Sequence, residues 1–290
     1  MTFSAETRQV SAFFLISFFF SWAFWTPGVL SHFGVSHARL SSADPLQLLG
    51  DLGPAVGALV VAAWNRGDIR HLGSSLWRAK SPPRWYAASI FIPVIIISVS
   101  SAARAATLHL NFCISTERIW HPGGLQSRLL SGFVGSAALA IGMFIFAAAE
   151  EIGWRGFALP RLISSIGFLP ATLFLGVMWA LWHLPLAFTD GNPLRGESFF
   201  LFAVSTALLS LLVGYIWVRT TSVLLAALFH TAGNVSFFLL EPTATTGYRS
   251  VIALIFVLGM AYACRRQAPG QSLAGKEAER VASTAGSSPG

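Results

Sequence analysis

The sequence predicts an all-α fold, a polytopic transmembrane helical bundle of about eight spans with both termini cytoplasmic. Hydrophobic residues make up 54% of the 290 positions and charged residues only 11%, a composition outside the range of soluble globular domains. The mean hydropathy is +0.64. Apolar runs also recur at a length of about 20 residues, which is what a helix needs to cross the hydrocarbon core of a bilayer.

The apolar runs divide the chain into an integral-membrane domain, residues 1–264, and a tail, residues 265–290, that is predicted to be disordered because it is rich in Gly, Ser and Ala. The first run is too long for the apolar region of a signal peptide, so we expect an uncleaved span. The short connection at 219–221 predicts a tight hairpin. The expected spans are residues 11–30, 48–64, 86–108, 129–149, 170–188, 198–218, 222–240 and 249–264.

The basic residues predict the orientation. The loop 65–85 carries Arg66, Arg70, Arg78, Lys80 and Arg84 against the single acid Asp68, and the positive-inside rule places it in the cytoplasm. Alternation then puts both termini and the segment 150–169 inside. It puts Cys113 and Cys264 on opposite faces, so no disulfide is expected. Six of the 19 basic residues fall outside: Arg39, Arg104, Arg118, Arg128, Arg195 and Arg249.

The net charge of +7 does not indicate nucleic-acid binding. The basic residues lie between apolar runs rather than in a patch interleaved with aromatic residues, so membrane topology accounts for them. The partners we expect are the lipid bilayer and, if the chain is an enzyme, a peptide or protein substrate. The sequence predicts no oligomeric state.

Three charged residues, Glu150, Glu151 and Arg155, directly follow the apolar run 136–149. A charge at bilayer depth costs at least ~2.5–3.5 kcal/mol, so such residues usually mark function. Glu151 and Arg155 are spaced i, i+4 and can meet within one helical turn. Because the charge count places this segment at the cytoplasmic ends of the helices, we expect its burial to be partial.

Three more polar residues stand in apolar surroundings: His183, His230 and Asn234. His230 and Asn234, spaced i, i+4, share a helix face. Each residue has a structural interpretation, as a solvated interfacial charge, a satisfied histidine or a hydrogen bond between helices. Trp179 and Trp182 are typical of packing or interface anchoring. If all of these residues are structural, however, the polar residues in three separate spans each need an independent explanation.

The combined set fits hydrolysis. A carboxylate partly removed from water suits general-base activation of a water molecule, and a neighbouring arginine can hold a second carboxylate in place. Two imidazoles and an amide could bind a metal, orient the water or donate to an oxyanion.

These residues also resemble the motifs of a known family. Glu150 to Arg155 matches the EExxxR motif of the CPBP group, the CAAX-processing and bacteriocin-processing intramembrane proteases (Abi family). Phe174 to His183 resembles its second motif, an aromatic-rich helix ending in His, and His230 to Asn234 matches its third, HxxxN. The motifs stand in the family's order, and Leu52 to Ala55 also looks like a family feature.

The resemblance implies a membrane endopeptidase in which Glu150 activates the water and Glu151 with Arg155 supports the site. Because the charge count places these residues near the cytoplasmic face, we expect the scissile bond to lie close to that face. His183 would help to activate or bind the water, and His230 with Asn234 would form an oxyanion site or complete a metal site. Candidate zinc ligands are Glu150, His183 and His230, since two His and one carboxylate suit a catalytic zinc. The HExxH signature of common zinc proteases is absent from the sequence, and we favour a mechanism without tightly bound zinc.

The alternative interpretation is a non-catalytic membrane protein. Glu150, His183 and His230 could form the proton relay of a transporter, although no pair of matching halves with broken helices is visible in the sequence. A bacteriocin-immunity protein that acts by binding is the other form of this alternative. The size and composition look bacterial, which predicts the cell membrane as the location.

Overall fold

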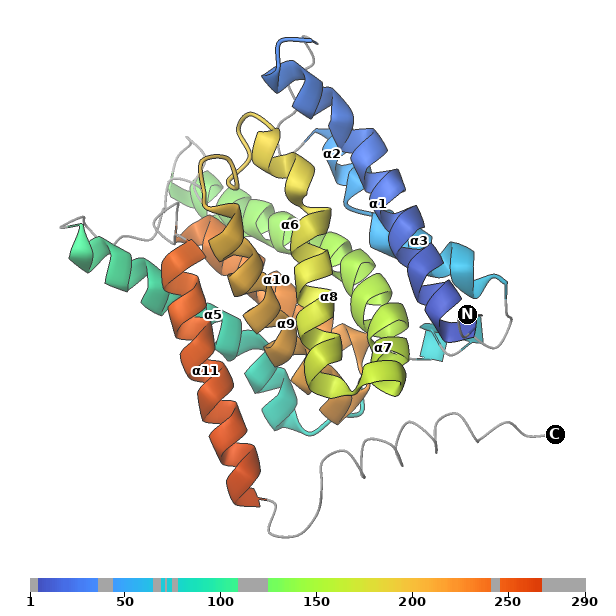
Figure 1. The fold of residues 1–290 in the computed structure, drawn as a ribbon. Coiled ribbons are helices and arrows are strands. Elements are labelled where there is room, and N and C mark those ends of the chain that lie inside the picture. The colour runs from blue at the N-terminus through green and yellow to red at the C-terminus, as the bar shows by residue number, and fades with distance from the viewer. Residues whose placement is uncertain are drawn as a thin grey trace.

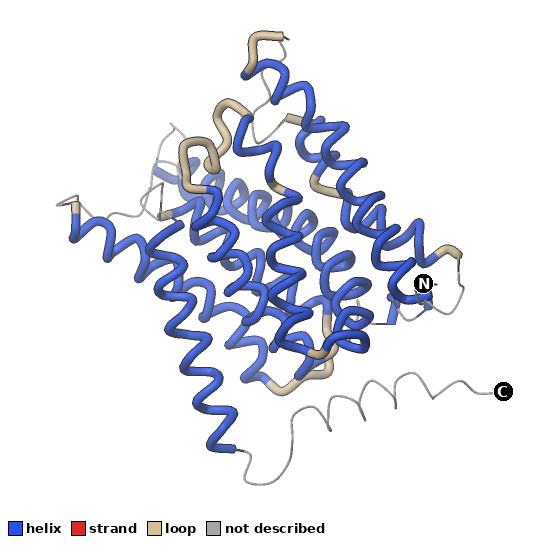
Figure 2. Tube along the Cα trace, in the orientation of Figure 1, coloured by secondary structure: helices blue, strands red, loops and turns tan. Residues whose placement is uncertain are grey.

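The computed structural model describes residues 5–35, 44–64, 69–70, 72–74, 78–108, 125–240 and 246–267, and all regular structure within these ranges is helical (Figures 1 and 2). The predicted all-α fold is therefore confirmed for this part of the chain. Cys113 and most of the tail lie outside the described residues, so the predictions about them stand untested.

Six helical segments within these ranges are long and apolar enough to cross a membrane. They are α1 (Ala5–His32), α2 with α3 (Pro45–Gly50 and Gly53–Ala62), α5 (Pro83–Thr107), the C-terminal part of α6 with η2 and α7 (Leu125–Glu151, Ile152–Ala158 and Leu159–Ile166), α8 with η3 (Phe168–Trp182 and Leu184–Phe188), and α9 (Phe199–Thr220). Two further helices, α10 (Val223–Leu239) and α11 (Thr246–Gln267), contain shorter apolar stretches. Each of the eight predicted runs is thus helical, in a polytopic helical bundle.

Two boundaries differ from the prediction. The fourth span was expected to end at residue 149, but the helix continues as a π-helix and then as α7, giving one apolar segment, Ala137–Ile166, with Glu150 and Glu151 near its middle. The charges do not end the span because they are neutralised within the protein, as described below. At the other end of the chain, α11 runs to Gln267, which places the first residues of the expected disordered tail in a helix.

The buried apolar side chains form two clusters. The first, which we call the aromatic cluster, joins α1, α3, η2, α7 and α8 and contains Phe13, Trp25, Trp154, Phe157 and Trp182 among its largest members. The second, the aliphatic cluster, joins α5, α9, α10 and α11 through residues such as Ile96, Leu212, Val213, Ile216 and Leu225. Figure 1 shows α11 lying across α5 and α9, away from α1.

Small residues allow the helices of the aromatic cluster to approach closely, as is common in membrane bundles. A Cβ built on Gly153 of η2 would lie 2.5 Å from the carbonyl oxygen of Pro54 on α3. A Cβ on Gly57 would lie 2.2 Å from the Ser17 hydroxyl oxygen on α1. The first contact brings η2, which directly follows the two glutamates, close to α3, and the second brings α3 close to α1.

The predicted hairpin between α9 and α10 is confirmed. Thr221 adopts a left-handed conformation with φ of 51°, which lets the chain reverse in two residues. The Arg78 guanidinium donates to the Thr221 hydroxyl at 2.7 Å, and the Ser222 hydroxyl donates to the Arg78 carbonyl at 2.7 Å. The hairpin is therefore fixed to the basic segment that precedes α5.

Candidate active site

The two acidic residues and the arginine are buried almost completely. The exposed fraction is 7% for Glu150 and 0% for Glu151 and Arg155. The Arg155 Nη1 donates to Glu151 Oε1 at 2.9 Å, so the predicted contact one turn apart is confirmed. The expectation of partial burial is wrong: the pair is hydrogen-bonded inside the protein, which offsets part of the cost of removing both charges from water. Glu151 Oε2 and Arg155 Nε and Nη2 are buried without a hydrogen-bond partner among the described residues.

His230 supplies a second contact to the same carboxylate. Its Nδ1 lies 3.0 Å from Glu151 Oε1, so the histidine finds on α6 the acidic partner that its own span lacks. Glu151 is thus held from two sides, by an arginine one turn further along its own segment and by a histidine from α10. This double contact fixes the carboxylate of Glu151 in position.

Trp179 on α8 contacts four of the six predicted site residues. Its indole Nε1 donates to Glu150 Oε2 at 2.8 Å, and its backbone carbonyl lies 2.9 Å from His183 Nδ1. Its ring faces the His230 ring edge to face at a centroid distance of 5.1 Å, and the Arg155 guanidinium lies 4.7 Å from the ring centre. Trp179 was interpreted as packing or anchoring, and its i, i+4 spacing from His183 was the signal that it belongs to the site.

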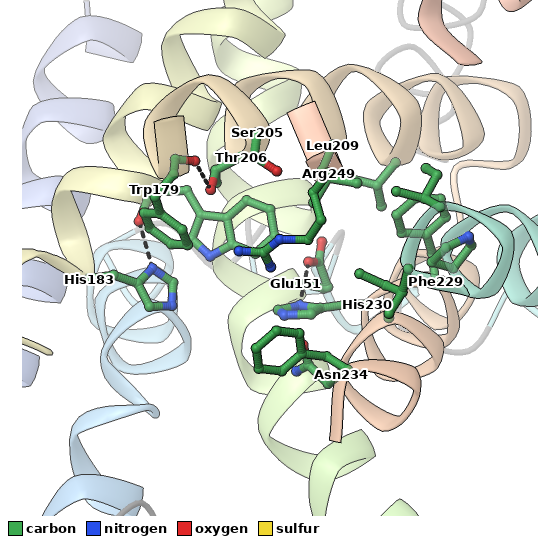
Figure 3. A pocket seen from close by; sticks show the side chains of 17 residues that line it. Glu151, Trp179, His183, Ser205, Thr206, Leu209, Phe229, His230, Asn234 and Arg249 are labelled. Atoms are coloured by element: carbon green, nitrogen blue, oxygen red, sulfur yellow. Dashed lines mark hydrogen bonds and ion pairs between the residues drawn. The ribbon is translucent and has the colours of Figure 1, made fainter. Parts of the chain in front are cut away.

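These groups surround one pocket with a volume of about 160 Å³ (Figure 3). Four predicted site residues line it: Glu151, His183, His230 and Asn234. The other two, Glu150 and Arg155, contact the lining residues Trp179 and Glu151. The walls are largely apolar and come from α5, α9 and α10, including Ile96, Ile97, Phe202, Leu209, Val213 and Phe229.

Asn234 shares its pocket-facing side of α10 with His230, as the i, i+4 spacing predicted. Its side chain is exposed, in contrast to the buried glutamates. The amide therefore stands where it can meet an incoming molecule, while the charged groups lie deeper.

The two glutamates differ in a way that matters for chemistry. Glu151 is fully buried, and its Oε1 accepts the contacts from both Arg155 and His230. Glu150 keeps a small exposed surface and accepts a single indole hydrogen bond. Glu150 also lies close enough to both imidazoles, His183 and His230, to interact with them electrostatically.

Two titratable residues near the site were not predicted. Asp51, half-buried at the junction of α2 and α3, interacts electrostatically with Glu150. The signal in the sequence that could have indicated Asp51 was its position directly before the segment Leu52 to Ala55. Arg249, which charge counting assigned to the outside, lines the same pocket as Glu151.

The candidate metal ligands do not assemble into a metal site in the described part of the chain, where no three His, Cys, Asp or Glu side chains gather suitably. His183 directs Nδ1 to the Trp179 carbonyl and His230 directs Nδ1 to Glu151. The three candidate ligands are therefore not gathered around one centre in the described residues, and we derive no step through a metal.

Comparison with known proteins agrees with these motifs. A family model described as type II CAAX prenyl endopeptidase Rce1-like matches residues 132–236, which hold all three motifs. Over these residues the chain is similar to the CAAX protease family. The CAAX protease match begins in α6 and ends in α10, so Arg249 on α11 lies beyond it.

A curated relative, CAAX prenyl protease 2 of Methanococcus maripaludis, is 30% identical over 112 residues. The alignment covers 36% of this chain and 41% of the relative. The chain thus spans about two fifths of the length of this CAAX protease.

Proposed function

We propose that the protein is a membrane-embedded endopeptidase that hydrolyses a peptide bond of a membrane-associated protein or peptide with water activated by Glu150. The observation that carries this proposal is the buried cluster of Glu150, Glu151 and Arg155, joined through Trp179 to two histidines at one pocket. The similarity of residues 132–236 to the CAAX protease family supports the reaction class, and the apolar helices support a location in the cell membrane.

Each residue has a role in this proposal. Glu150, with one oxygen held by Trp179, takes a proton from water, and the resulting hydroxide attacks the peptide carbonyl carbon. Donors from His230 and Asn234 stabilise the oxyanion that forms. The C–N bond then breaks as Glu150 returns the proton to the leaving nitrogen. His183 orients the water, while Arg155 holds Glu151 in place.

The direction in which the pocket extends bears on which membrane face is closer to the site of cleavage. The Ser250 hydroxyl donates to the Leu201 carbonyl at 3.2 Å, so α9 and α11 begin side by side, away from the hairpin that contacts Arg78. The pocket reaches Phe202 and Arg249 in the first turns of these helices. It therefore extends toward the helix ends opposite the basic loop, and the predicted position of the scissile bond near the cytoplasmic face stays a prediction.

A single cysteine tests that prediction. In a chain with Cys113 and Cys264 changed to Ser, an Asn234→Cys variant is treated in intact cells with a membrane-impermeant thiol reagent. A cytoplasmic opening predicts labelling only after the cells are permeabilised. Labelling of intact cells would place the opening on the other face.

Replacement of Glu150 tests the proposed reaction. The Glu150→Gln variant keeps the shape of the side chain but cannot take up the proton, and general-base catalysis contributes about 10²–10⁴-fold. We expect cleavage to fall by at least that factor while the purified variant unfolds at the wild-type temperature. Glu6→Gln, an exposed substitution on α1, is the matched control.

Comparison of the membrane peptides of wild-type and Glu150→Gln cells would identify the substrate. Full activity in the Glu150→Gln variant would overturn the assigned mechanism. A pH-driven flux in proteoliposomes that is lost in both His183→Ala and His230→Ala would support the transporter interpretation instead.

A further inference from the structure

Arg249 is a charged residue in the pocket that the proposed reaction does not use. It lies in the first turn of α11, and its side chain enters the space between Trp179 and the walls from α9 and α10 (Figure 3). The guanidinium carbon is 5.3 Å from the centre of the Phe237 ring. Its Nε is buried without a hydrogen-bond partner among the described residues, so the donor capacity of this side chain is only partly used.

The surroundings of Arg249 favour an anion. The first turn of α11 carries no acidic residue, and the N-terminal end of a helix has a positive partial charge, which disfavours a cation and attracts a negative group. The apolar pocket walls screen charge weakly, so an anion entering here is attracted more strongly than at the surface. Glu197 is the acid that interacts with Arg249 electrostatically.

We propose that Arg249 binds a carboxylate of the substrate and thereby selects which peptide bond enters the site. This inference rests on the proposed endopeptidase function. A guanidinium presents parallel N–H donors that match the two oxygens of a carboxylate, and a peptide offers carboxylates in its C-terminus and in its Asp and Glu side chains. Because Arg249 lines the same pocket as Glu151, His183 and His230, the bound carboxylate lies within a few residues of the scissile bond.

The simplest competing role is structural, with Arg249 serving only as the counter-charge of Glu197. The two roles differ in one measurable respect. A structural arginine affects all substrates alike, whereas a carboxylate-binding arginine matters only for a substrate that carries the carboxylate.

Three peptides separate these roles. They share an N-terminal acyl chain, a fluorophore and apolar residues near the C-terminus, and they end in a free acid, in an amide, or in an amide with Asp near the end. Cleavage of each is measured with the wild-type protein, Arg249→Gln and Arg249→Lys. Arg195→Gln is the control, because Arg195 pairs with Asp190 at the surface, away from the pocket.

We expect Arg249→Gln to raise the KM for the free-acid peptide by roughly 10–100-fold, as for loss of a charged hydrogen bond, and to leave the amide peptide unchanged. Arg249→Lys should recover part of the difference, because it keeps the charge without the planar pair of donors. If Arg249→Gln instead raises the KM for the Asp peptide and not for the free-acid peptide, the bound carboxylate belongs to a side chain. Equal effects on all three peptides, or no effect on any, would overturn the proposal.

The proposed function and this inference fail in different ways. If wild-type protein cleaves the peptides and Glu150→Gln does not, the endopeptidase function stands. In that case, a ratio of the KM for the acid peptide to the KM for the amide peptide that is equal in wild type and Arg249→Gln rejects the carboxylate site alone. If the wild type cleaves none of them, fluorescence anisotropy of the same peptides on the Glu150→Gln protein decides. Binding of the acid that is tighter than that of the amide and is lost with Arg249→Gln supports the site, and equal binding rejects it.

Discussion

The aromatic cluster and the aliphatic cluster make different contributions to the site. In the aromatic cluster, ring contacts connect α1, η2 and α8, with Phe13 to Trp154 at 5.4 Å and Trp154 to Trp182 at 5.8 Å between centroids. The aliphatic cluster brings His230 to the site, and its helices supply most of the pocket wall. The site lies where the two clusters meet.

This difference separates two requirements of the proposed hydrolytic site. The carboxylates and Arg155 must be held rigidly, because buried charges are tolerated only with good pairing geometry. The substrate-binding wall must instead accept an apolar chain, for which Ile, Leu and Val side chains are suited. The hydrogen bonds from Trp179 to Glu150 and from His230 to Glu151 connect one requirement with the other.

The largest effect is expected from Glu151→Gln, which breaks the connection between the clusters. It leaves the fully buried Arg155 without its counter-charge, a change that costs about 3–5 kcal/mol in buried pairs. We expect a large loss of stability in thermal unfolding of the detergent-purified protein, together with loss of cleavage.

The double variant Glu151→Leu/Arg155→Leu separates stability from chemistry. Replacing both charges with apolar residues should recover most of the unfolding temperature while cleavage stays absent. A single Glu151→Gln variant as stable as the wild type would show that the pair does not hold this region together.

A smaller effect is expected from Gly153→Ala, which acts on the aromatic cluster alone. The added Cβ would lie 2.5 Å from the Pro54 carbonyl oxygen, so the backbone of η2 or α3 must shift, at a cost of about 1–3 kcal/mol. Because Gly153 follows Glu151 by two residues, we expect cleavage to fall along with the unfolding temperature. Gly142→Ala on α6 is the matched control, since its Cβ meets nothing within 4 Å. Equal behaviour of the two variants would contradict the close packing of η2 on α3.

Trp179→Phe should have a smaller effect on stability and a selective effect on catalysis. Phenylalanine keeps the ring and the backbone carbonyl that His183 contacts, and removes only the N–H that donates to Glu150. The net value of one such bond to a charged group is about 1.5–3 kcal/mol, so we expect kcat to fall roughly tenfold or more with little change in KM. Trp217→Phe is the control, because the buried Trp217 Nε1 has no hydrogen-bond partner in the described residues. A drop in KM and kcat that is the same for both tryptophans would indicate general packing loss.

The sequence predicted the helices well and the tertiary contacts less well. Membrane hydropathy is a local property, so the apolar runs and the hairpin at Thr221 could be predicted from composition and length alone. The contact between Glu151 and Arg155 followed from helix geometry. Charge counting, by contrast, treats polar residues as span ends, and it therefore missed the nearly complete burial of Glu150. The contact of Glu151 with His230 depends on how α6 packs against α10, which no local pattern encodes.

The smallest effect is expected from removing metal ions, and it tests whether the two clusters hold the histidines apart. His183 on α8 is directed at the Trp179 carbonyl, and His230 on α10 is directed at Glu151, so each imidazole already uses Nδ1 within its own contact. A zinc site would require His183, His230 and Glu150 to gather around one centre, and in the described residues they do not. We therefore expect 1,10-phenanthroline to leave the cleavage rate of the purified protein unchanged, with metal analysis showing less than one zinc per chain. Inhibition that is relieved by added zinc would mean that the histidines reorganise around a metal in the active enzyme.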